Sequence, residues 1–306
     1  MNVITVTELR KRYGGRNVVD GVSFTVGEGE IFGILGPNGA GKTTTVECIA
    51  GLRRPDGGAI SVLGLDPRRD RAELRHRLGM QLQESHLPDR LTVAEALELY
   101  ATFYRDPADW PALLADLGLA GQRRTRFGKL SGGQKQRVSI ALALVGNPRV
   151  AVLDELTTGL DPQARRDTWE VVEQIRARGV TVVLVTHFMD EAERLCDRVA
   201  LLDAGRAVAV DTPAGLVSRV DAEQRMRFRP AGPLDDRLLT GLPEVTGVTR
   251  QGTTVIVTGT GNLVQAVIAA LARNQIVAAE LRVEQSTLDD AFLALTGRRP
   301  DTEQGA

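Results

Sequence analysis

A glycine-rich segment near the N-terminus has the residue types and spacing of a phosphate-binding loop. The apolar run 31–35 is followed by Gly36-Pro37-Asn38-Gly39-Ala40-Gly41-Lys42-Thr43-Thr44. Glycines at these positions allow a tight turn in which successive N–H groups face one anion. Lys42 is placed to reach the β- and γ-phosphates of a triphosphate, Thr43 can ligate the bridging Mg²⁺, and a helix starting near Lys42 adds its positive end. By itself the segment predicts only nucleotide binding, which kinases, GTPases and many ATPases share.

A second motif supplies two adjacent carboxylates. The apolar run 150–153 ends in Asp154 and Glu155. We expect Asp154 to lie beside the magnesium ion, and Glu155, adjacent but differently aimed, to polarise the attacking water. The alternative, that both residues only cap a strand end, is disfavoured by the phosphate-binding loop upstream.

A third motif, Leu130-Ser131-Gly132-Gly133-Gln134, precedes an amphipathic helical pattern. Its hydroxyl and its glycine N–H groups would form a second anion site at a helix N-terminus. One chain therefore holds two half-sites for one γ-phosphate.

The elements that must position these motifs are short apolar strands that alternate with longer amphipathic segments, from Val3 to about Val220. This pattern predicts an α/β domain built on a largely parallel sheet. The clearest strands are 31–35, 150–153 and 180–185. Residues 3–9 and 18–26 instead predict antiparallel strands around a turn at Gly14-Gly15. Helices are predicted at 43–51, 93–103, 133–145, 162–177 and 190–196, the fourth opened by Pro162 directly after the N-cap residue Asp161.

The sequence changes character after about residue 220. Proline and glycine residues interrupt 221–247, then 248–258 alternates like a pair of strands and 263–271 is helix-like. We therefore predict two domains, a larger one over 1–220 and a small α+β domain over 221–306.

Composition limits the classes of partner and location. The chain has 306 residues with 38 Lys and Arg against 39 Asp and Glu, so its net charge of −1 gives no global reason to expect nucleic acid. Two cysteines without a partner motif imply no disulfide framework. No window approaches the ~18 apolar residues of a membrane span. We expect a cytoplasmic chain whose membrane role comes through a partner.

In this order, the three motifs resemble those of the nucleotide-binding subunit of an ATP-binding-cassette (ABC) transporter, across residues 3–220. The resemblance implies a P-loop NTPase core of the ABC ATPase type, with a mostly parallel sheet flanked by helices, an N-terminal antiparallel subdomain and a helical subdomain. In that family two subunits meet head to tail, and each ATP lies between the glycine-rich loop of one and the Leu-Ser-Gly-Gly-Gln segment of the other. Ser131, Gly132 and Gly133 would thus contact the γ-phosphate in trans.

Other family residues map onto single positions. Tyr13 matches the aromatic residue that stacks on adenine, although a core or strand-edge tyrosine is the alternative. Gln83, eight residues before Leu91, matches the glutamine that contacts the magnesium ion or the water and senses the transport partner. Gln81 is a nearby competitor, but the spacing favours Gln83.

His187, after the strand 180–186, matches the switch histidine that holds the γ-phosphate and orients Glu155. Asp161 lies in the segment 157–161, which matches the loop that crosses the dimer interface. Leu156 departs from the family, which usually has proline there. Proline would fix φ before the interface loop, so leucine predicts a freer loop.

These assignments form one predicted site. The catalytic residues are Glu155, His187 and Lys42, and the magnesium ligands are Thr43, Gln83 and Asp154. ATP would be held by Tyr13, Gly36, Pro37, Asn38, Gly39, Ala40, Gly41, Lys42, Thr43, Thr44, Gln83, Ser131, Gly132, Gly133, Gln134, Asp161 and His187.

The resemblance implies an ATPase that acts as a homodimer on a separate integral-membrane permease, at the inner face of the cell membrane. The tail 286–298 resembles the end of ATPases of bacterial drug and antibiotic exporters, although Leu288, Phe292 and Leu295 would equally suit a plain amphipathic helix. The alternatives are an importer ATPase, which shares the cassette, and a non-transport ABC protein acting on ribosomes or DNA. An ABC protein that acts on ribosomes usually carries a second cassette, and one that acts on DNA ends carries a long coiled-coil insert. This sequence shows neither feature.

Overall fold

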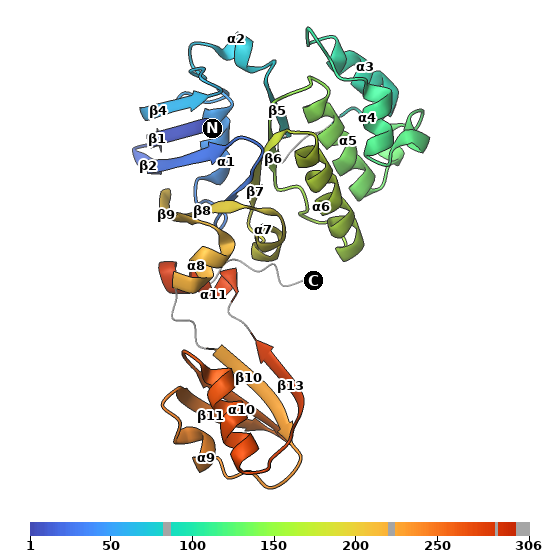
Figure 1. The fold of residues 1–306 in the computed structure, drawn as a ribbon. Coiled ribbons are helices and arrows are strands. Elements are labelled where there is room, and N and C mark those ends of the chain that lie inside the picture. Colours follow the sequence, from blue (N-terminus) through green and yellow to red (C-terminus); the bar gives the residue numbers. More distant parts are fainter. Residues whose placement is uncertain (82–86, 220–223, 285–286, 298–306) are drawn as a thin grey trace. The chain divides into compact units, whose positions relative to one another are not determined.

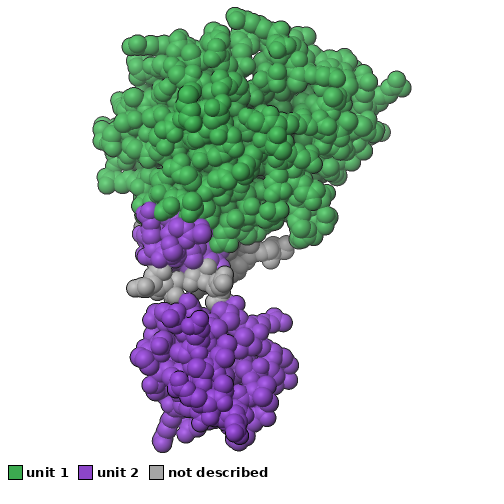
Figure 2. All heavy atoms as spheres, viewed as in Figure 1, with its two compact units in different colours: residues 1–213, 300–306 green, residues 214–299 purple. Residues whose placement is uncertain are grey.

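The computed structural model describes residues 1–81, 87–219, 224–284 and 287–297. They divide into two compact units, Met1–Pro213 and Ala214–Arg299 (Figure 2). The domain boundary predicted near residue 220 stays a prediction, because residues 220–223 lie outside the described part.

The central element of the first unit is a six-stranded sheet (Figure 1). In sheet order its strands are β5 (Leu78–Gln81), β6 (Val150–Asp154), β7 (Thr181–Thr186), β3 (Ile31–Leu35), β8 (Arg198–Asp203) and β9 (Arg206–Asp211). All neighbours pair in parallel except β8 and β9. Every residue of β3, β6 and β7 is buried, which explains the apolar runs that make up most of each strand. The carboxyl ends of these three strands meet at one edge, where the glycine-rich loop, Glu155 and His187 follow them.

A three-stranded antiparallel sheet is formed by β1 (Asn2–Tyr13), β2 (Arg16–Gly27) and β4 (Gly57–Val62), with β1 in the middle. Gly14 and Gly15 connect β1 to β2, and both have positive φ, at 53° and 84°. Two consecutive residues with positive φ suit a tight hairpin, and glycine adopts this conformation without steric cost. The predicted N-terminal antiparallel strands are confirmed.

The helices of the first unit include every one predicted from sequence. They are α1 (Lys42–Ile49), α2 (Arg71–Leu74), α3 (Val93–Ala101), α4 (Trp110–Asp116), α5 (Gly132–Leu144), α6 (Pro162–Ala177) and α7 (Met189–Leu195), with short 3₁₀ turns at Ala120–Gln122 and Phe127–Lys129. Helices α3, α4 and α5 pack on one another, and α5 packs on β5 (Figure 1). This group is the predicted helical subdomain.

The second unit has its own sheet and core. Its chain order is β10 (Gln224–Pro230), α9 (Arg237–Thr240), β11 (Val245–Gln251), β12 (Thr254–Gly259), α10 (Leu263–Arg273) and β13 (Ala278–Glu284), preceded by α8 (Pro213–Arg219) and followed by α11 (Leu288–Thr296). The antiparallel sheet has the order β11-β12-β10-β13, a β-α-β-β-α-β arrangement. Met226 and Phe228 of β10 pack with Val257 and Val267 in a separate core. The strand pair and the helix expected here are present.

Candidate nucleotide-binding site

The loop between β3 and α1 can be built only with glycine at two of its positions. Gly36 has φ 153° and Gly41 has φ 94°. A Cβ atom at Gly36 would lie 2.1 Å from the carbonyl oxygen of Leu202, and one at Gly41 would lie 2.5 Å from that of Val18. The backbones of β8 and β2 therefore lie so close to this loop that only glycine fits, and glycine allows the turn in which successive N–H groups can face one anion.

Lys42 begins α1, and its side chain folds back over the loop. It is only 4% exposed, and its Nζ donates to the carbonyl oxygens of Gly36 at 2.8 Å and Pro37 at 3.1 Å. The same Nζ lies 4.0 Å from Oε1 of Glu155. Because an ammonium group has three donors and these acceptors are neutral, phosphate oxygens can replace the carbonyls at little cost.

Asp154, the last residue of β6, is fully buried. Its backbone N–H donates to Oε1 of Gln81 at 3.0 Å, whereas neither of its carboxylate oxygens has a hydrogen-bond partner within the described ranges. Burial raises the pKa of Asp154 to about 6, with Thr43 and Lys42 acting in the opposite direction. Two buried carboxylate oxygens without donors, beside a threonine hydroxyl, fit a Mg²⁺ ion, which binds hard oxygen ligands.

Glu155 follows with φ 50°, the left-handed region that a side chain of this kind rarely adopts. Its backbone N–H donates to the carbonyl oxygen of Val185 at 2.9 Å, which carries the chain across to β7. Oε1 of Glu155 lies 3.4 Å from Nδ1 of His187. The facing imidazole, a potential hydrogen-bond donor, holds the pKa of Glu155 below its ordinary value despite burial. The group is therefore a carboxylate at neutral pH, as a base requires.

His187 directly follows β7 and is held by its neighbours. Its ring packs on the ring of Phe188, with centroids 4.1 Å apart, and the guanidinium of Arg165 lies 4.2 Å from the Phe188 centroid. The Phe188 N–H donates to the hydroxyl of Thr186 at 3.0 Å. Both ring nitrogens of His187 are buried, and neither makes a hydrogen bond of normal geometry in the part of the chain that the structure describes. An anionic ligand could supply such a partner to Nε2.

The segment 131–134 forms the start of α5. The Ser131 N–H donates to Oε1 of Gln134 at 3.0 Å, and the Gln134 N–H donates to the Ser131 hydroxyl at 3.3 Å, a reciprocal capping box. Ser131 and Gly132 are exposed. The predicted second half-site is thus a helix N-terminus that faces outward.

Asp161 and Leu156 lie in the loop between β6 and α6. Oδ1 of Asp161 accepts from the N–H groups of Gln163 and Ala164, both at 3.0 Å, which makes it the N-cap of α6. Leu156 is buried, and the Thr157 that follows it is buried as well. The freer loop expected from leucine in place of proline stays a prediction, with the Leu156 side chain packed in the interior at this point.

Tyr13 and the two candidate glutamines occupy different environments. Tyr13 ends β1 with 41% of its surface exposed, and Lys11 and Arg53 lie 5.3 and 5.7 Å from its ring centroid. It is a strand-end tyrosine with an accessible ring, not a core residue. Gln83 lies outside the described residues. Gln81, its competitor, is buried and bonded to the Asp154 backbone.

Sequence comparison relates this site to known proteins. The profile of the family described as ABC transporter matches residues 19–158. The Nod factor export ATP-binding protein I of Burkholderia orbicola (strain AU 1054) is 46% identical over 220 residues, which cover 70% of this chain and 72% of that protein. The chain belongs to the ABC transporter family.

Solved structures agree with this membership. The ATP-binding subunit of an ABC transporter matches with a TM-score of 0.64 and 32% identity, covering 71% of this chain and 92% of that one. A dimeric ATP-binding cassette in a post-hydrolysis state, bound to ADP and Pi, matches with a TM-score of 0.61 and 27% identity, covering 68% and 98%. The predicted fold class is confirmed, and the chain is an ATP-binding subunit of an ABC transporter, an ATPase coupled to transport.

Among the residues that the structure describes, no helix is long and apolar enough to cross a membrane.

A buried acid beside the site was missed by the sequence analysis. Glu191 of α7 is buried and accepts a hydrogen bond from the indole N–H of Trp169 at 3.0 Å. Residue type alone does not single out Glu191, since α7 holds several acidic residues, but the position of Glu191 along the helix does. Glu191 lies on the same helical stripe as the buried Ala192 and Leu195, where an exposed acid would not be placed.

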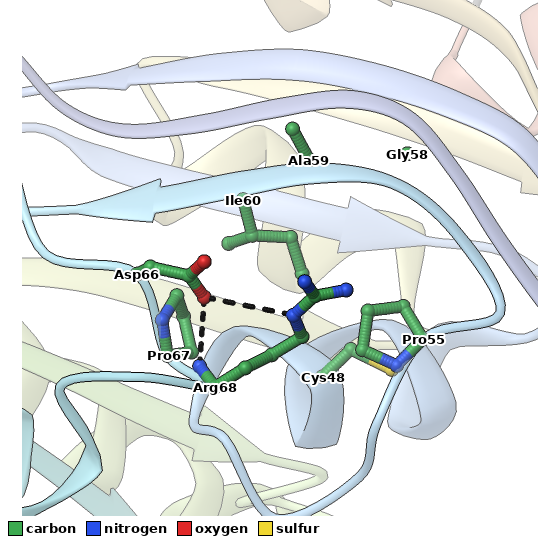
Figure 3. A pocket seen from close by; sticks show the side chains of 8 residues that line it. All are labelled: Cys48, Pro55, Gly58, Ala59, Ile60, Asp66, Pro67 and Arg68. Carbon is green, nitrogen blue, oxygen red and sulfur yellow. Dashed lines mark hydrogen bonds and ion pairs between the residues drawn. The ribbon is translucent and has the colours of Figure 1, made fainter.

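One small pocket of the first unit lies apart from this site (Figure 3). Its volume is about 90 Å³, and it is lined by Cys48, Pro55, Gly58, Ala59, Ile60, Asp66, Pro67 and Arg68. Arg68 closes on Asp66, whose Oδ1 accepts the Arg68 backbone N–H at 2.8 Å. Burial raises the pKa of Cys48 to about 11, so its thiol stays protonated at neutral pH. The pocket is far smaller than the roughly 300 Å³ at which small-molecule sites begin.

Proposed function

We propose that this chain drives export, through a permease, of a drug-like or other hydrophobic solute. Support for the direction comes from the relative of 46% identity, which is named as an export ATP-binding protein. The proposed class of solute rests on the sequence of the tail alone, since the predicted helix, α11, buries Leu288 and Phe292 as a plain amphipathic helix also would. The tail resembles that of drug and antibiotic exporter ATPases.

Within the chain, Glu155 is the proposed base that polarises water. The observation that carries this role is its position, with Oε1 4.0 Å from Nζ of Lys42 and 3.4 Å from Nδ1 of His187, directly after the buried Asp154. Asp154 and Thr43, together with Gln83, would hold Mg²⁺, which when bound would neutralise phosphate charge. Lys42 and His187 would hold the γ-phosphate, and Tyr13 would stack on adenine.

The working unit is proposed to be a homodimer. Ser131, Gly132, Gly133 and Gln134 of one chain would contact the γ-phosphate held by the loop of the other, and Asp161 would lie near that interface. The exposed N-terminus of α5 supports this, because anions bind at such ends. ATP binding would close the dimer, and hydrolysis at Glu155 would open it and move the permease.

Reconstitution tests the direction of transport. The full-length chain is purified with the membrane protein that accompanies it and placed in liposomes with the ATPase facing outward. An exporter then accumulates a fluorescent hydrophobic dye in the lumen when ATP is added outside. The Glu155→Gln complex should not accumulate dye, whereas Glu170→Gln, an exposed glutamate of α6, should. ATP-driven loss of dye from preloaded vesicles would show import instead.

A further inference from the structure

Glu191 is a fully buried acid that the proposed chemistry does not use. It is 1% exposed, although glutamate is rarely buried to this degree unless it is partnered. One oxygen, Oε1, accepts the indole N–H of Trp169 on α6 at 3.0 Å. This bond joins α7 to α6, and an apolar side chain could pack there without the cost of burying a carboxyl.

Two hydroxyls from the proposed catalytic loops lie beside the same carboxyl. Burial raises the pKa of Glu191, and the Thr186 hydroxyl, the Trp169 indole N–H and the Thr157 hydroxyl act in the opposite direction with a smaller effect. Thr157 is two residues after Glu155, and Thr186 is the residue before His187. Glu191 therefore lies where the two loops meet.

The polar atoms at this junction are incompletely satisfied. Oε2 of Glu191 and the Thr157 hydroxyl are both buried, and neither makes a hydrogen bond of normal geometry within the described ranges, although the hydroxyl is near enough to lower the pKa of the carboxyl. Leaving such atoms unpaired is costly, so pairing between the Thr157 hydroxyl and Glu191 would stabilise the loop after β6. The Thr186 hydroxyl already accepts the Phe188 N–H, which fixes the turn that carries His187.

We propose that Glu191 is a positioning residue of the ATPase, which through Thr157 and Thr186 holds the loops of Glu155 and His187 in register with each other and with α6. The inference rests on the roles proposed above for Glu155 and His187. Glu191 touches neither the nucleotide nor the water in this scheme. Its effect is on the geometry of hydrolysis and not on ATP binding, because the glycine-rich loop and Lys42 are held by other contacts.

Steady-state ATP hydrolysis by full-length variants tests this role. Glu191→Leu, which removes the carboxyl at similar volume, should lower kcat by about tenfold to a hundredfold and leave KM for ATP within about twofold. Glu191→Gln keeps an acceptor for Trp169 and groups for both hydroxyls, so it should retain at least about half of kcat. Glu193→Gln, on the exposed side of α7, is the matched control and should not change either constant. Unchanged kcat in Glu191→Leu, or equal loss in the leucine and glutamine variants, would overturn the proposal.

The Thr157→Val variant separates positioning from general damage, and it serves where Glu191→Leu does not fold. It should also lower kcat with KM unchanged, and the double variant should lose no more than the larger single loss, because both act on one contact. Full kcat in Thr157→Val, or losses that multiply, would refute the link between the two residues. Glu155→Gln is assayed alongside. If that variant hydrolyses ATP normally, the proposed site fails, whereas an inactive Glu155→Gln with normal Glu191→Leu refutes only the role of Glu191.

Discussion

The two proposed half-sites for the γ-phosphate are held by the chain in opposite ways. In the glycine-rich loop, Lys42 is buried and its ammonium donates to carbonyls of its own loop. In the segment 131–134, Ser131 is exposed, and its hydroxyl and N–H form a capping box with Gln134. The half-site at the glycine-rich loop is thus enclosed by its own chain. The half-site at 131–134 is a capped helix N-terminus that faces solvent.

This difference has a physical reason. The loop needs neighbours from β8 and β2 to reach its shape, since the carbonyls of Leu202 and Val18 exclude any Cβ at Gly36 and Gly41. A helix N-terminus needs no such support, because its N–H groups already point along the axis. In a catalytic site that opens and closes, the catalytic residues can therefore stay on the enclosed half-site. The helix end can approach the nucleotide and move away from it without losing its own structure.

The largest expected effect tests whether the chemistry belongs to the enclosed half-site. Glu155→Gln should keep ATP binding and lower turnover by on the order of 10²-fold or more, because the amide cannot accept the proton of water. ATP affinity and hydrolysis of the full-length chain, measured with Glu170→Gln as control, check it. Near-normal turnover would remove Glu155 from this role.

The next prediction tests whether the exposed half-site of one chain contacts the nucleotide that is held by another chain. Lys42→Ala disables the loop, and Ser131→Arg disables the helix end. A mixed dimer would carry both lesions at one site and neither at the other. ATPase activity of the mixture, measured with the membrane partner, should therefore exceed that of either variant alone. A mixture no more active than its parts would contradict a shared site, unless both sites must act together.

A smaller effect concerns the loop that leads from the enclosed half-site to α6. Asp161→Ala removes the acceptor of two backbone N–H groups and should destabilise the first unit by about 1 kcal/mol. Asp161→Asn keeps an N-cap acceptor and should cost far less. Both tryptophans, Trp110 and Trp169, lie in this unit, so fluorescence during urea unfolding reports it alone. Equal stability of the alanine and asparagine variants would show that the cap contributes nothing.

The comparison also shows what the sequence could and could not predict. Local signals located both half-sites: the strand before Gly36, the helix after Ser131 and the cap at Asp161 all follow from residue type and spacing. Contacts between distant segments did not follow. The family resemblance implied that His187 orients Glu155, but no local pattern brings these two side chains together, and the register of the sheet likewise depends on packing of strands that are far apart in sequence.

Two further features, helix α4 and the buried Glu191, were not predicted from the sequence, and each has a physical reason. Helix α4 is only seven residues long and carries proline in its first turn, so its periodicity is too short to detect. Glu191 was missed because residue type alone does not separate a buried acid from exposed ones on α7. The second unit was predicted as α+β, but its strand order could not be read from a segment interrupted by proline and glycine.

The smallest expected effect separates the whole nucleotide site from the second unit. Every described residue assigned to ATP or magnesium lies within residues 1–213, and the second unit has a core of its own around Met226 and Phe228. A chain ending at residue 220 should therefore bind ATP within about tenfold of the full-length affinity, equivalent to about 1.4 kcal/mol. Coupling to the permease or stability of the dimer should fall instead, as expected for an assembly or regulatory domain. Tryptophan fluorescence verifies folding, and full-length Lys42→Ala shows the signal of lost binding. A shortened chain that folds but behaves like Lys42→Ala would mean that the second unit completes the nucleotide site, and the proposed separation of the two domains would be wrong.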